Sequence, residues 1–323
     1  MTGILALEPT DDVATFAQRV ERLEYDSLWT GELWGRDSFV ALTQAAGATD
    51  DLGLGTAIVN VYGRTPATLA QAAATLDNAS GGRFRLGLGT STAKVVEDLH
   101  SMSFENPPRR THETAELTGE FLTAEGRVSY DGELFSVADF PSLGTDVPVY
   151  TAALGPAMRR VTGRVADGWL PHNIPFHDLG NAFETIAETA READRDPGSI
   201  TVAPYVPSAV SEDREAALRT ARGHVAYYVG SGEGYRAAVA AHYDGADAVA
   251  EAWREGDREG AREAVTDDML EGLTVAGTPQ EAREQLAEVA GRDIIDEPIV
   301  VIPGGASEEV ADSTVEALAP ANR

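Results

Sequence analysis

Residues 52–91 limit the possible fold more than any other part of the chain, and they read LGLGTAIVNVYGRTPATLAQAAATLDNASGGRFRLGLGTS. An apolar, Gly-rich run ends in polar residues, an Ala-rich segment begins at Pro66, and a second Gly-rich run again ends in polar residues. This order predicts a strand, a helix that starts at the proline, and a second parallel strand. Asn60, Tyr62 and Arg64 then stand at the carboxyl end of the first strand, where parallel α/β folds keep their active sites.

The alternation of strand and helix patterns continues along the whole chain. Strands are expected at residues 3–7, 27–30, 52–59, 83–89, 147–151, 168–170, 200–206 and 298–302. Helices are expected at residues 11–23, 37–48, from 66 onward, 278–290 and 307–318. Eight strands that alternate with helices predict a TIM (β/α)8 barrel of the α/β class. No Pro/Ser-rich linker interrupts the sequence, so a single domain is expected over residues 1–323.

Two segments are longer than a barrel repeat requires and are expected as insertions within that domain. Residues 99–146 contain a helix pattern at 109–123 and then a hairpin pattern around the turn Asp131-Gly132. Residues 211–275 contain a long helical stretch from about 213 to 273. This second insertion is interpreted either as a lid or oligomer element or as surface helix that only packs.

Acidic residues dominate the charge of the chain, with 53 Asp and Glu against 25 Lys and Arg and a net charge of −28. Such a surface repels nucleic acid and anionic membranes. Lys94 is the sole lysine. An acidic, lysine-poor composition is typical of proteins from a salt-loaded cytoplasm, as in a halophilic archaeon, and it predicts loss of structure or activity on desalting.

Cysteine is absent, which excludes disulfides, thiolate nucleophiles and cysteine metal sites. The residues after Met1 lack the pattern of a secretory signal, and no apolar run approaches membrane-spanning length. A soluble, cytoplasmic protein is therefore expected. No cluster of His and carboxylates has metal-ligand spacing, so no metal site is expected.

Five blocks of sequence carry a family resemblance. They are YDSLWTGELWGRD (25–37), the stretch 52–91, VPVYTAALGPAMRRVTGRVADGWLPHN (147–173), DDMLEGLTVAGTPQEAREQL (267–286) and IVVIPGG (299–305). In their residues and in their spacing along the chain, these blocks resemble the bacterial-luciferase-like superfamily of flavin and deazaflavin enzymes. Within it they are most similar to the methylene-tetrahydromethanopterin reductases, which use coenzyme F420. The resemblance implies the luciferase-like variety of the TIM barrel.

The segment ALGPAMRR joins a strand to a helix. Its backbone N–H groups at Leu154, Gly155 and Ala157 lie at a helix N-terminus, which attracts anions such as phosphate. From the residues alone, an ordinary turn with Gly and Pro is the competing interpretation. The resemblance favours the phosphate of a flavin or deazaflavin here, held by a segment that also includes Ala153 and Pro156.

The end of the third strand is the second expected part of the cofactor site. In similar enzymes a non-prolyl cis peptide forms a bulge that supports the back face of the ring, and the matching bond here joins Ala57 and Ile58. From the residues alone the strand could be regular. The resemblance implies a cofactor-binding set of Ala57, Ile58, Asn60, Arg64, Gly89, Thr90, Ala153, Leu154, Gly155, Pro156 and Ala157.

Two departures from the family pattern concern the acids. Similar enzymes carry Asp-His where this chain has Glu32 and Leu33, and the methanopterin reductases carry Glu where this chain has Leu5. Glu8 and Glu32 are the candidate proton donors, although both could be plain loop carboxylates. Trp34 and His172 are the candidate substrate-binding residues.

The leading hypothesis is an F420-dependent oxidoreductase that passes hydride to a C1-carrying pterin or folate, either methylene-tetrahydromethanopterin or methylene-tetrahydrofolate. An FMN-dependent monooxygenase is the alternative on the same fold, because a deazaflavin carries carbon at position five and forms no hydroperoxide there. A non-catalytic flavin-binding barrel is the alternative of another class. Family habit and the helical insertion favour a homodimer or a higher homo-oligomer.

Overall fold

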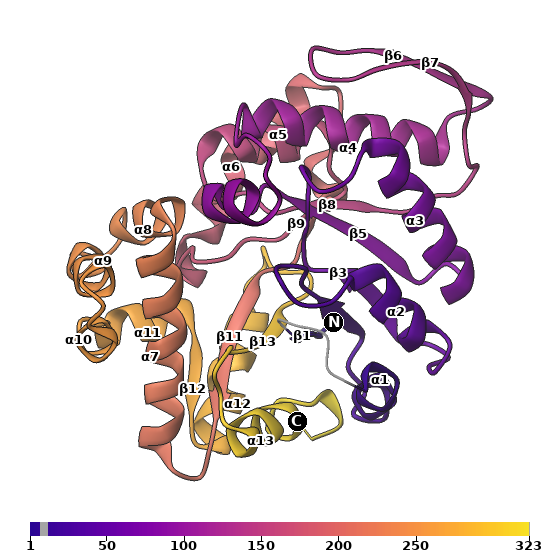
Figure 1. Cartoon of the computed structure of the whole chain (residues 1–323). Coiled ribbons are helices and arrows are strands. Elements are labelled where there is room, and N and C mark those ends of the chain that lie inside the picture. Colours follow the sequence, from indigo (N-terminus) through magenta and orange to yellow (C-terminus); the bar gives the residue numbers. More distant parts are fainter. Residues whose placement is uncertain (7–11, 323) are drawn as a thin grey trace.

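The computed structural model describes residues 1–6 and 12–322. A parallel sheet curls around a central axis, and helices cover its outside (Figure 1). The strands of this sheet are β1 (Gly3–Ala6), β2 (Ser27–Thr30), β3 (Gly53–Thr56), β4 (Val59–Asn60), β5 (Phe84–Gly89), β8 (Val149–Thr151), β9 (Gly168–Trp169), β10 (Thr201–Val202), β11 (Tyr205–Val210), β12 (Val275–Gly277) and β13 (Ile299–Ile302).

The sheet closes into a barrel through the seventh strand. Its order is β10-β9-β8-β5-β3-β2-β1-β13-β11-β12, and only Ala203 and Pro204 separate β10 from β11. On one side the N–H of Ala203 donates to the carbonyl of Trp169 (2.9 Å), and on the other the carbonyl of Pro204 accepts from Ile299 (2.8 Å). Residues 201–210 therefore join β9 to β13, and the predicted eight-stranded barrel is confirmed.

Large side chains fill the barrel interior because glycines face them. An added Cβ at Gly55 would collide with the ring of Trp29, and one at Gly168 would collide with the ring of Tyr150. Both aromatic side chains are buried, and their ring centroids lie 5.7 Å apart. The glycines in the strands thus make room for an aromatic core, and the barrel does not enclose a pore.

Helices pack on the outer face of each strand in the predicted order. They are α1 (Val13–Arg22), α2 (Ser38–Ala46), α3 (Pro66–Ser80), α4 (Pro107–Thr123), α5 (Pro156–Val165), α6 (Leu179–Glu192), α12 (Pro279–Ala290) and α13 (Glu308–Ala317). Short turns of other helix types are η1 (Val95–Leu99, a π-helix), η2 (Phe176–Asp178), η3 (Pro197–Ser199) and η4 (Pro320–Asn322). Thr65, Thr278 and Ser307 cap their helices with a side-chain oxygen, which explains where these helices begin.

The expected single helical stretch at 213–273 is wrong in detail, because the structure has five separate helices there. They are α7 (Arg214–Ser231), α8 (Glu233–Ala240), α9 (Ala246–Arg254), α10 (Arg258–Glu263) and α11 (Asp267–Leu273). They form a lobe at the left of Figure 1 with a hydrophobic cluster of its own, centred on residues such as Val225, Val249 and Met269. Gly232 ends α7 in an extended conformation, and this break turns α8 back onto α7.

The hairpin predicted in the first insertion is confirmed as β6 (Arg127–Asp131) and β7 (Ser136–Pro141). A buried carboxylate on α4 holds its turn, since Glu113 accepts hydrogen bonds from the N–H groups of Glu133, Leu134 and Phe135 at 2.8–3.1 Å. Burial alone would raise the pKa of Glu113, but these N–H groups bring its pKa below the usual value.

The expected cis bond between Ala57 and Ile58 is wrong, since the described residues contain no cis peptide bond and this one is trans. The strand is nevertheless interrupted at this point, because β3 ends at Thr56 and β4 begins at Val59. Trans geometry avoids the roughly 2.5–4 kcal/mol of a non-prolyl cis bond. Gly87 makes the interruption possible, because a Cβ there would collide with the carbonyl oxygens of Thr56 and Ala57.

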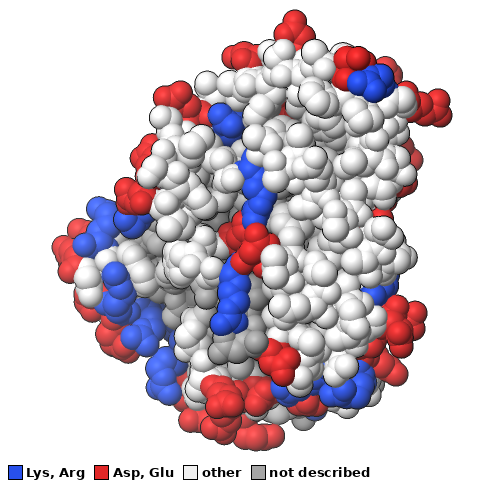
Figure 2. Space-filling view, turned by 45° about the vertical axis from the view of Figure 1, so that its right-hand side comes forward, with Lys and Arg blue, Asp and Glu red and all other residues white. Residues whose placement is uncertain are grey.

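Charged side chains are unevenly spread over the surface (Figure 2). At the left of the view, where the lobe of α8 to α10 lies, basic and acidic groups alternate, as in the ion pairs of Arg236 with Glu233 and Asp247. The right half of the view is largely free of charge over a wide area. Within residues 1–6 and 12–322, none of the helices combines the length and apolar character needed to cross a bilayer.

Candidate functional site

The carboxyl ends of the barrel strands bring most of the predicted site residues to one face of the molecule. Asn60 and Gly89 are the last residues of β4 and β5, Thr90 follows β5, and Ala153 and His172 follow β8 and β9. Glu8 lies outside the described residues. In a parallel barrel this face is the one that carries catalytic groups.

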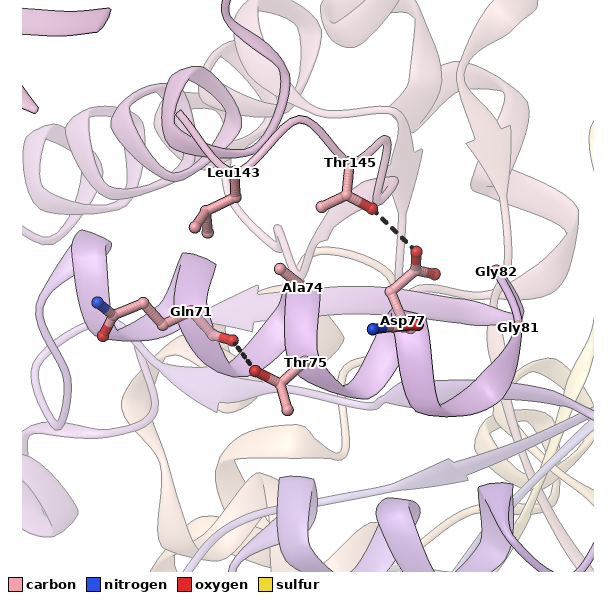
Figure 3. Close-up of a pocket in the computed structure, with 9 residues that line it drawn as sticks. Gln71, Ala74, Thr75, Asp77, Gly81, Gly82, Leu143 and Thr145 are labelled. Carbon is pink, nitrogen blue, oxygen red and sulfur yellow. Dashed lines mark hydrogen bonds between the residues drawn. The ribbon is translucent and has the colours of Figure 1, made fainter. Parts of the chain in front are cut away.

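Two surface hollows lie away from this face. One, of about 620 Å³, is lined by Gln71, Ala74, Thr75, Asp77, Asn78, Gly81, Gly82, Leu143 and Thr145 (Figure 3). The other, of about 1030 Å³, lies between α4, α5 and residues 142–147. The first is lined by residues that precede β5 or β8 in the chain, and the second by Val149 at the start of β8 and by residues that precede β8, β9 or β10. Both therefore lie at the amino-terminal ends of these strands, where barrel enzymes do not place their chemistry.

Glu32 and Arg64 form a half-buried ion pair at the ends of the second and third strands. The guanidinium of Arg64 donates to both carboxylate oxygens of Glu32 (2.5 and 3.0 Å) and also to Asp37 (2.6 Å). The N–H of Ser38 donates to the same carboxylate (3.1 Å). Hydrogen bonding to Glu32 is the main reason why the pKa of Arg64 is raised.

The hydrogen bonds from Arg64 and Ser38 limit the roles that Glu32 can have. Both carboxylate oxygens of Glu32 accept hydrogen bonds from Arg64, and one of them also accepts from the N–H of Ser38, so no oxygen of Glu32 is left open to a substrate. Proton donation by Glu32 stays a prediction, and it requires Arg64 to move away from the carboxylate.

Asn60 is buried and organises the loop that follows its strand. Its side-chain oxygen accepts from the N–H groups of Tyr62 (3.0 Å) and Gly63 (2.6 Å), which is an Asx turn. Its amide nitrogen lies 3.1 Å from Nε2 of His100, at the end of the π-helix η1. Asn60 thereby ties the third strand to the loop after β5, and the π-helix is a feature that recurs at functional sites.

Ile58 forms an apolar platform at the mouth of the barrel. An added Cβ at Gly89 would lie 3.1 Å from the Ile58 side chain, so the glycine leaves room for Ile58 to pack against β5. The hydroxyl of Tyr205 donates to the carbonyl of Ala57 (2.6 Å) and fixes the interrupted strand across the barrel. Burial raises the pKa of Tyr205 well above its usual range, which keeps this donor protonated.

The start of α5 offers unfilled hydrogen-bond donors. Gly155 is its N-cap residue, no side chain caps the helix, and the space around a Cβ at Gly155 is open. On the same helix, Nε of Arg159 is buried without a hydrogen-bond partner, and burial lowers the pKa of Arg159. Pro156 and Ala157 lie in this first turn, where an anion is favoured, and Leu154 directly precedes the N-cap.

His172 lies in a cluster of aromatic side chains rather than at an open surface. It is 7% exposed, its Nε2 lies 3.3 Å from Nε2 of His224 on α7, and Tyr205 and Tyr228 pack against its ring. Burial and then the charge of His224 lower the pKa of His172 well below its usual range. Burial lowers the pKa of His224 to about 3, so both rings are neutral at pH 7.

Trp34 lies on the other side of the mouth, in the loop after β2, and 60% of its surface is exposed. The sequence analysis did not find Tyr205 or His224. Tyr205 begins β11 and could have been suspected from its place at a strand, whereas His224 is separated from His172 by 52 residues and no pattern connects them.

The described geometry can now be compared with known proteins. The family model described as luciferase-like monooxygenase matches residues 2–294. The chain belongs to this family. The 5,10-methylenetetrahydromethanopterin reductase of Methanolobus tindarius is 31% identical over 291 residues, which are 87% of each chain. The enzyme of the same name from Archaeoglobus fulgidus is 30% identical over 283 residues, or 85% of each chain.

Solved structures of luciferase-like proteins share the fold. The coenzyme F420-dependent tetrahydromethanopterin reductase from Methanopyrus kandleri superposes with a TM-score of 0.82 at 24% identity, over 99% of this chain and 97% of that one. An F420-dependent secondary alcohol dehydrogenase, solved with an F420-acetone adduct, gives 0.76 at 20% identity over the whole of both chains. A monooxygenase from Streptomyces bottropensis gives 0.70 at 20% identity, over 99% and 98% of the chains.

Proposed function

We propose that this luciferase-like protein is a coenzyme F420-dependent oxidoreductase, and that it passes hydride from the reduced deazaflavin to the C1 group of a methylene-tetrahydropterin or methylene-tetrahydrofolate. The observation that carries the proposal is the identity of about 30% to two archaeal 5,10-methylenetetrahydromethanopterin reductases over more than four-fifths of the chain. The fold itself is shared with enzymes of other chemistry and does not decide the substrate.

Three features of the site suit a phosphate-bearing, planar coenzyme. The N-terminus of α5 has open space at Gly155 and no side-chain cap. Nε of Arg159 and Nδ2 of Asn173 are buried without hydrogen-bond partners. Orphaned donors of this kind usually have an unrecorded partner, and an anion with several oxygens supplies one.

Different residues of the site would hold different parts of such a coenzyme. Residues 153–157 and Arg159 would hold the phosphate, and Ile58 would support the ring from behind on its platform against Gly89. Asn60 and Arg64 would reach the ring edge or the tail. When bound, the reduced deazaflavin supplies the hydride.

Opening a methylene-pterin ring also needs a proton at the pterin nitrogen, and an acid near the mouth would supply it. Glu8 and Glu32 are the candidates. Arg64 occupies both carboxylate oxygens of Glu32, so a bound substrate would have to draw Arg64 away before Glu32 could act. Trp34, exposed at the same rim, would stack on the substrate ring.

An FMN-dependent monooxygenase is a second candidate, because the matching family model is described by that activity and a monooxygenase shares the fold. Equilibrium binding of F420 and of FMN in molar KCl separates the two cofactors. A stopped-flow measurement then follows oxidation of bound reduced F420 by each methylene-carrier. Micromolar F420 binding with acceptor-dependent oxidation supports the proposal; preference for FMN with oxygen consumption contradicts it, and binding without turnover indicates a non-catalytic barrel.

A matched pair of variants tests the phosphate site. Gly155→Asp places a carboxylate at the start of α5 and is expected to weaken F420 binding at least roughly tenfold, because like charges meet there. Gly180→Asp places the same group in the first turn of α6, where an added side chain is also unobstructed, and should leave the affinity unchanged. Equal effects of the two substitutions would remove α5 from the cofactor site.

A further inference from the structure

Asn60 lies at the mouth of the barrel, on the same side of its strand as Ile58. Its neighbours Val59 and Val61 both belong to the outer hydrophobic core between the sheet and the helices. Successive side chains of a strand point to opposite faces, so the side chain of Asn60 points toward the inside of the barrel. Ile58 packs against the inner cluster on that side. Asn60 therefore shares a face with the apolar platform that Ile58 forms.

The hydrogen bonds of Asn60 fix the tautomer of His100. The amide oxygen of Asn60 accepts from two backbone N–H groups, those of Tyr62 and Gly63. The two ends of the amide can therefore not be exchanged, and its NH2 group is the one that lies 3.1 Å from Nε2 of His100. Because an NH2 group only donates, Nε2 accepts, and the proton of the neutral imidazole is on Nδ1.

This arrangement leaves the imidazole of His100 with one unused donor. Within residues 1–6 and 12–322, no protein group accepts a hydrogen bond from Nδ1 of His100. The ring of His100 is half-buried, whereas Asn60 is only 1% exposed. A bound molecule can therefore reach the imidazole of His100, but it has almost no access to the amide of Asn60.

The backbone around His100 is unusual in three places. His100 directly follows the π-helix η1, and its N–H donates to the carbonyl of Val95, five residues earlier (3.2 Å). Ser91 before this helix and Ser101 after it both have a left-handed backbone, with φ of 58° and 55°. Left-handed residues other than glycine and π-helices both recur at functional sites, where the surrounding contacts hold them in place. Here they bring the imidazole of His100 to the end of the third strand.

We propose that His100 donates a hydrogen bond from Nδ1 to an acceptor atom at the ring edge of the bound coenzyme, and that Asn60 acts through His100 as a positioning residue. The inference rests on the proposed function for the identity of the ligand, and it moves the contact suggested for Asn60 to His100. Carbonyl oxygens and ring nitrogens of a flavin or deazaflavin are acceptors of the required kind. A donor that is already held in one tautomer and one orientation loses little freedom on binding, which increases the affinity.

Two substitutions separate this contact from a merely structural role of His100. In His100→Gln the amide oxygen takes the place of Nε2 and accepts from Asn60, but no donor is left at the position of Nδ1. In His100→Asn the shorter amide keeps a donor near the position of Nδ1 and loses the contact with Asn60.

Equilibrium binding in molar KCl and thermal unfolding give opposite orders for the two variants. His100→Gln should keep the wild-type melting temperature and weaken F420 binding about tenfold, the effect of one hydrogen bond. His100→Asn should melt at a lower temperature than His100→Gln and bind F420 more tightly than it. If the wild type prefers FMN, the same comparison is made with FMN.

The tautomer of His100 is measured without any coenzyme. Nitrogen-15 NMR of histidine-labelled protein distinguishes a protonated ring nitrogen from an unprotonated one. The signal that is missing in His100→Gln identifies His100 among the six histidines. At alkaline pH we expect Nδ1 to carry the proton and Nε2 to carry none.

The inference and the proposed function fail in different ways. A proton on Nε2 of His100 overturns the inference, and so does a coenzyme affinity of His100→Gln equal to that of the wild type, while the proposed function stands. A wild type that binds neither F420 nor FMN contradicts the proposed function, and the inference falls with it.

Discussion

Glu297 lies inside the barrel with no exposed surface, which is rare for a carboxylate. It accepts from the hydroxyl of Ser27 and from the guanidinium of Arg85 (2.5 Å), and the indole of Trp29 donates to Ser27 (2.7 Å). Within this network the indole of Trp29, the hydroxyl of Ser27 and both carboxylate oxygens of Glu297 each have a partner. Removing one member leaves the others buried without partners.

We expect Glu297→Ala to lower the free energy of unfolding by about 3 kcal/mol, since it leaves Arg85 without its counter-ion in the interior. Chemical denaturation in molar KCl measures the change. The matched control is Glu288→Ala, which removes the exposed partner of Arg292 on α12 and should cost less than about 1 kcal/mol. Equal losses in the two variants would show that the interior pair is not special.

Tyr205 makes one hydrogen bond that ties the interrupted third strand to the seventh. Tyr205→Phe should lower the free energy of unfolding by about 1 kcal/mol, because the carbonyl of Ala57 loses its donor in a buried place. Tyr228→Phe is the control, since the recorded contacts of Tyr228 are those of its ring with His172, His224 and Tyr235, which phenylalanine keeps. If the proposed function holds, Tyr205→Phe also weakens F420 binding, whereas Tyr228→Phe does not.

At the scale of elements, the contact between α7 and the barrel depends on two neutral histidines. The pKa of His224 is about 3 and that of His172 is also lowered, so the folded protein binds fewer protons than the unfolded chain below pH 6.5. Stability from this contact is complete above that pH. It is lost progressively as the pH falls, because the two histidines bind protons in the unfolded chain at pH values where they stay neutral in the folded protein.

His224→Phe should therefore reduce the acid sensitivity of the protein. Between pH 6.5 and 5 the free energy of unfolding of the wild type should fall more steeply than that of the variant, by about 1.4 kcal/mol per pH unit. Urea titrations at a series of pH values give both slopes. Parallel slopes would mean that His224 accepts its proton without disturbing the docked helix.

Sequence patterns predicted most strands and helices of this fold, and the elements that they missed have physical reasons. Strands and helices follow local periodicity, so the eight strands were found within a few residues. The breaks between α7 and α11 were missed, because Gly232 ends a helix only in combination with the packing of α8. The cis bond after Ala57 was predicted from resemblance and is absent, while the path of the interrupted strand there needs the room that Gly87 leaves for the carbonyl oxygens of Thr56 and Ala57.

Pairings across the fold were outside the reach of sequence reasoning. Glu32 and Arg64 were both selected as site residues, but their direct contact follows from the neighbouring positions of the second and third strands. His172 was selected for the substrate, and its partner His224 comes from the insertion. Such contacts join elements that are adjacent in space and distant in sequence, which local patterns do not encode.

At the scale of the whole molecule, excess negative charge opposes the compact state. Arginines form ion pairs with part of the acidic residues, as Arg19 does with Asp312 and Glu316, but 53 acidic residues face 25 basic ones. The remaining repulsion acts over about 30 Å at 0.01 M salt and over about 3 Å at 1 M. Salt is therefore expected to stabilise both the fold and any association between copies.

Transfer from molar to millimolar KCl should lower the melting temperature by roughly 5 °C or more, because unscreened carboxylates repel within one fold. Differential scanning calorimetry over a KCl series measures the shift. Sucrose at equal osmolality screens no charge but is excluded from the surface, so the rise in melting temperature that it causes measures the stabilisation that does not depend on screening, and the rise in KCl should exceed it. A melting temperature independent of KCl would contradict the halophilic interpretation.

The closure of the barrel also has a consequence for the order in which the chain is synthesised. The first strand pairs with β13, and Arg85 leaves the ribosome 212 residues before its counter-ion Glu297. The hydrogen bond of Tyr25 can form only later still, since its hydroxyl donates to the carbonyl of Val315. Until β13 has been synthesised, β1 has an open edge and the interior has an unneutralised cation. The nascent protein is therefore exposed to mispairing over the synthesis of roughly 300 residues, and β13 and α13 end that exposure.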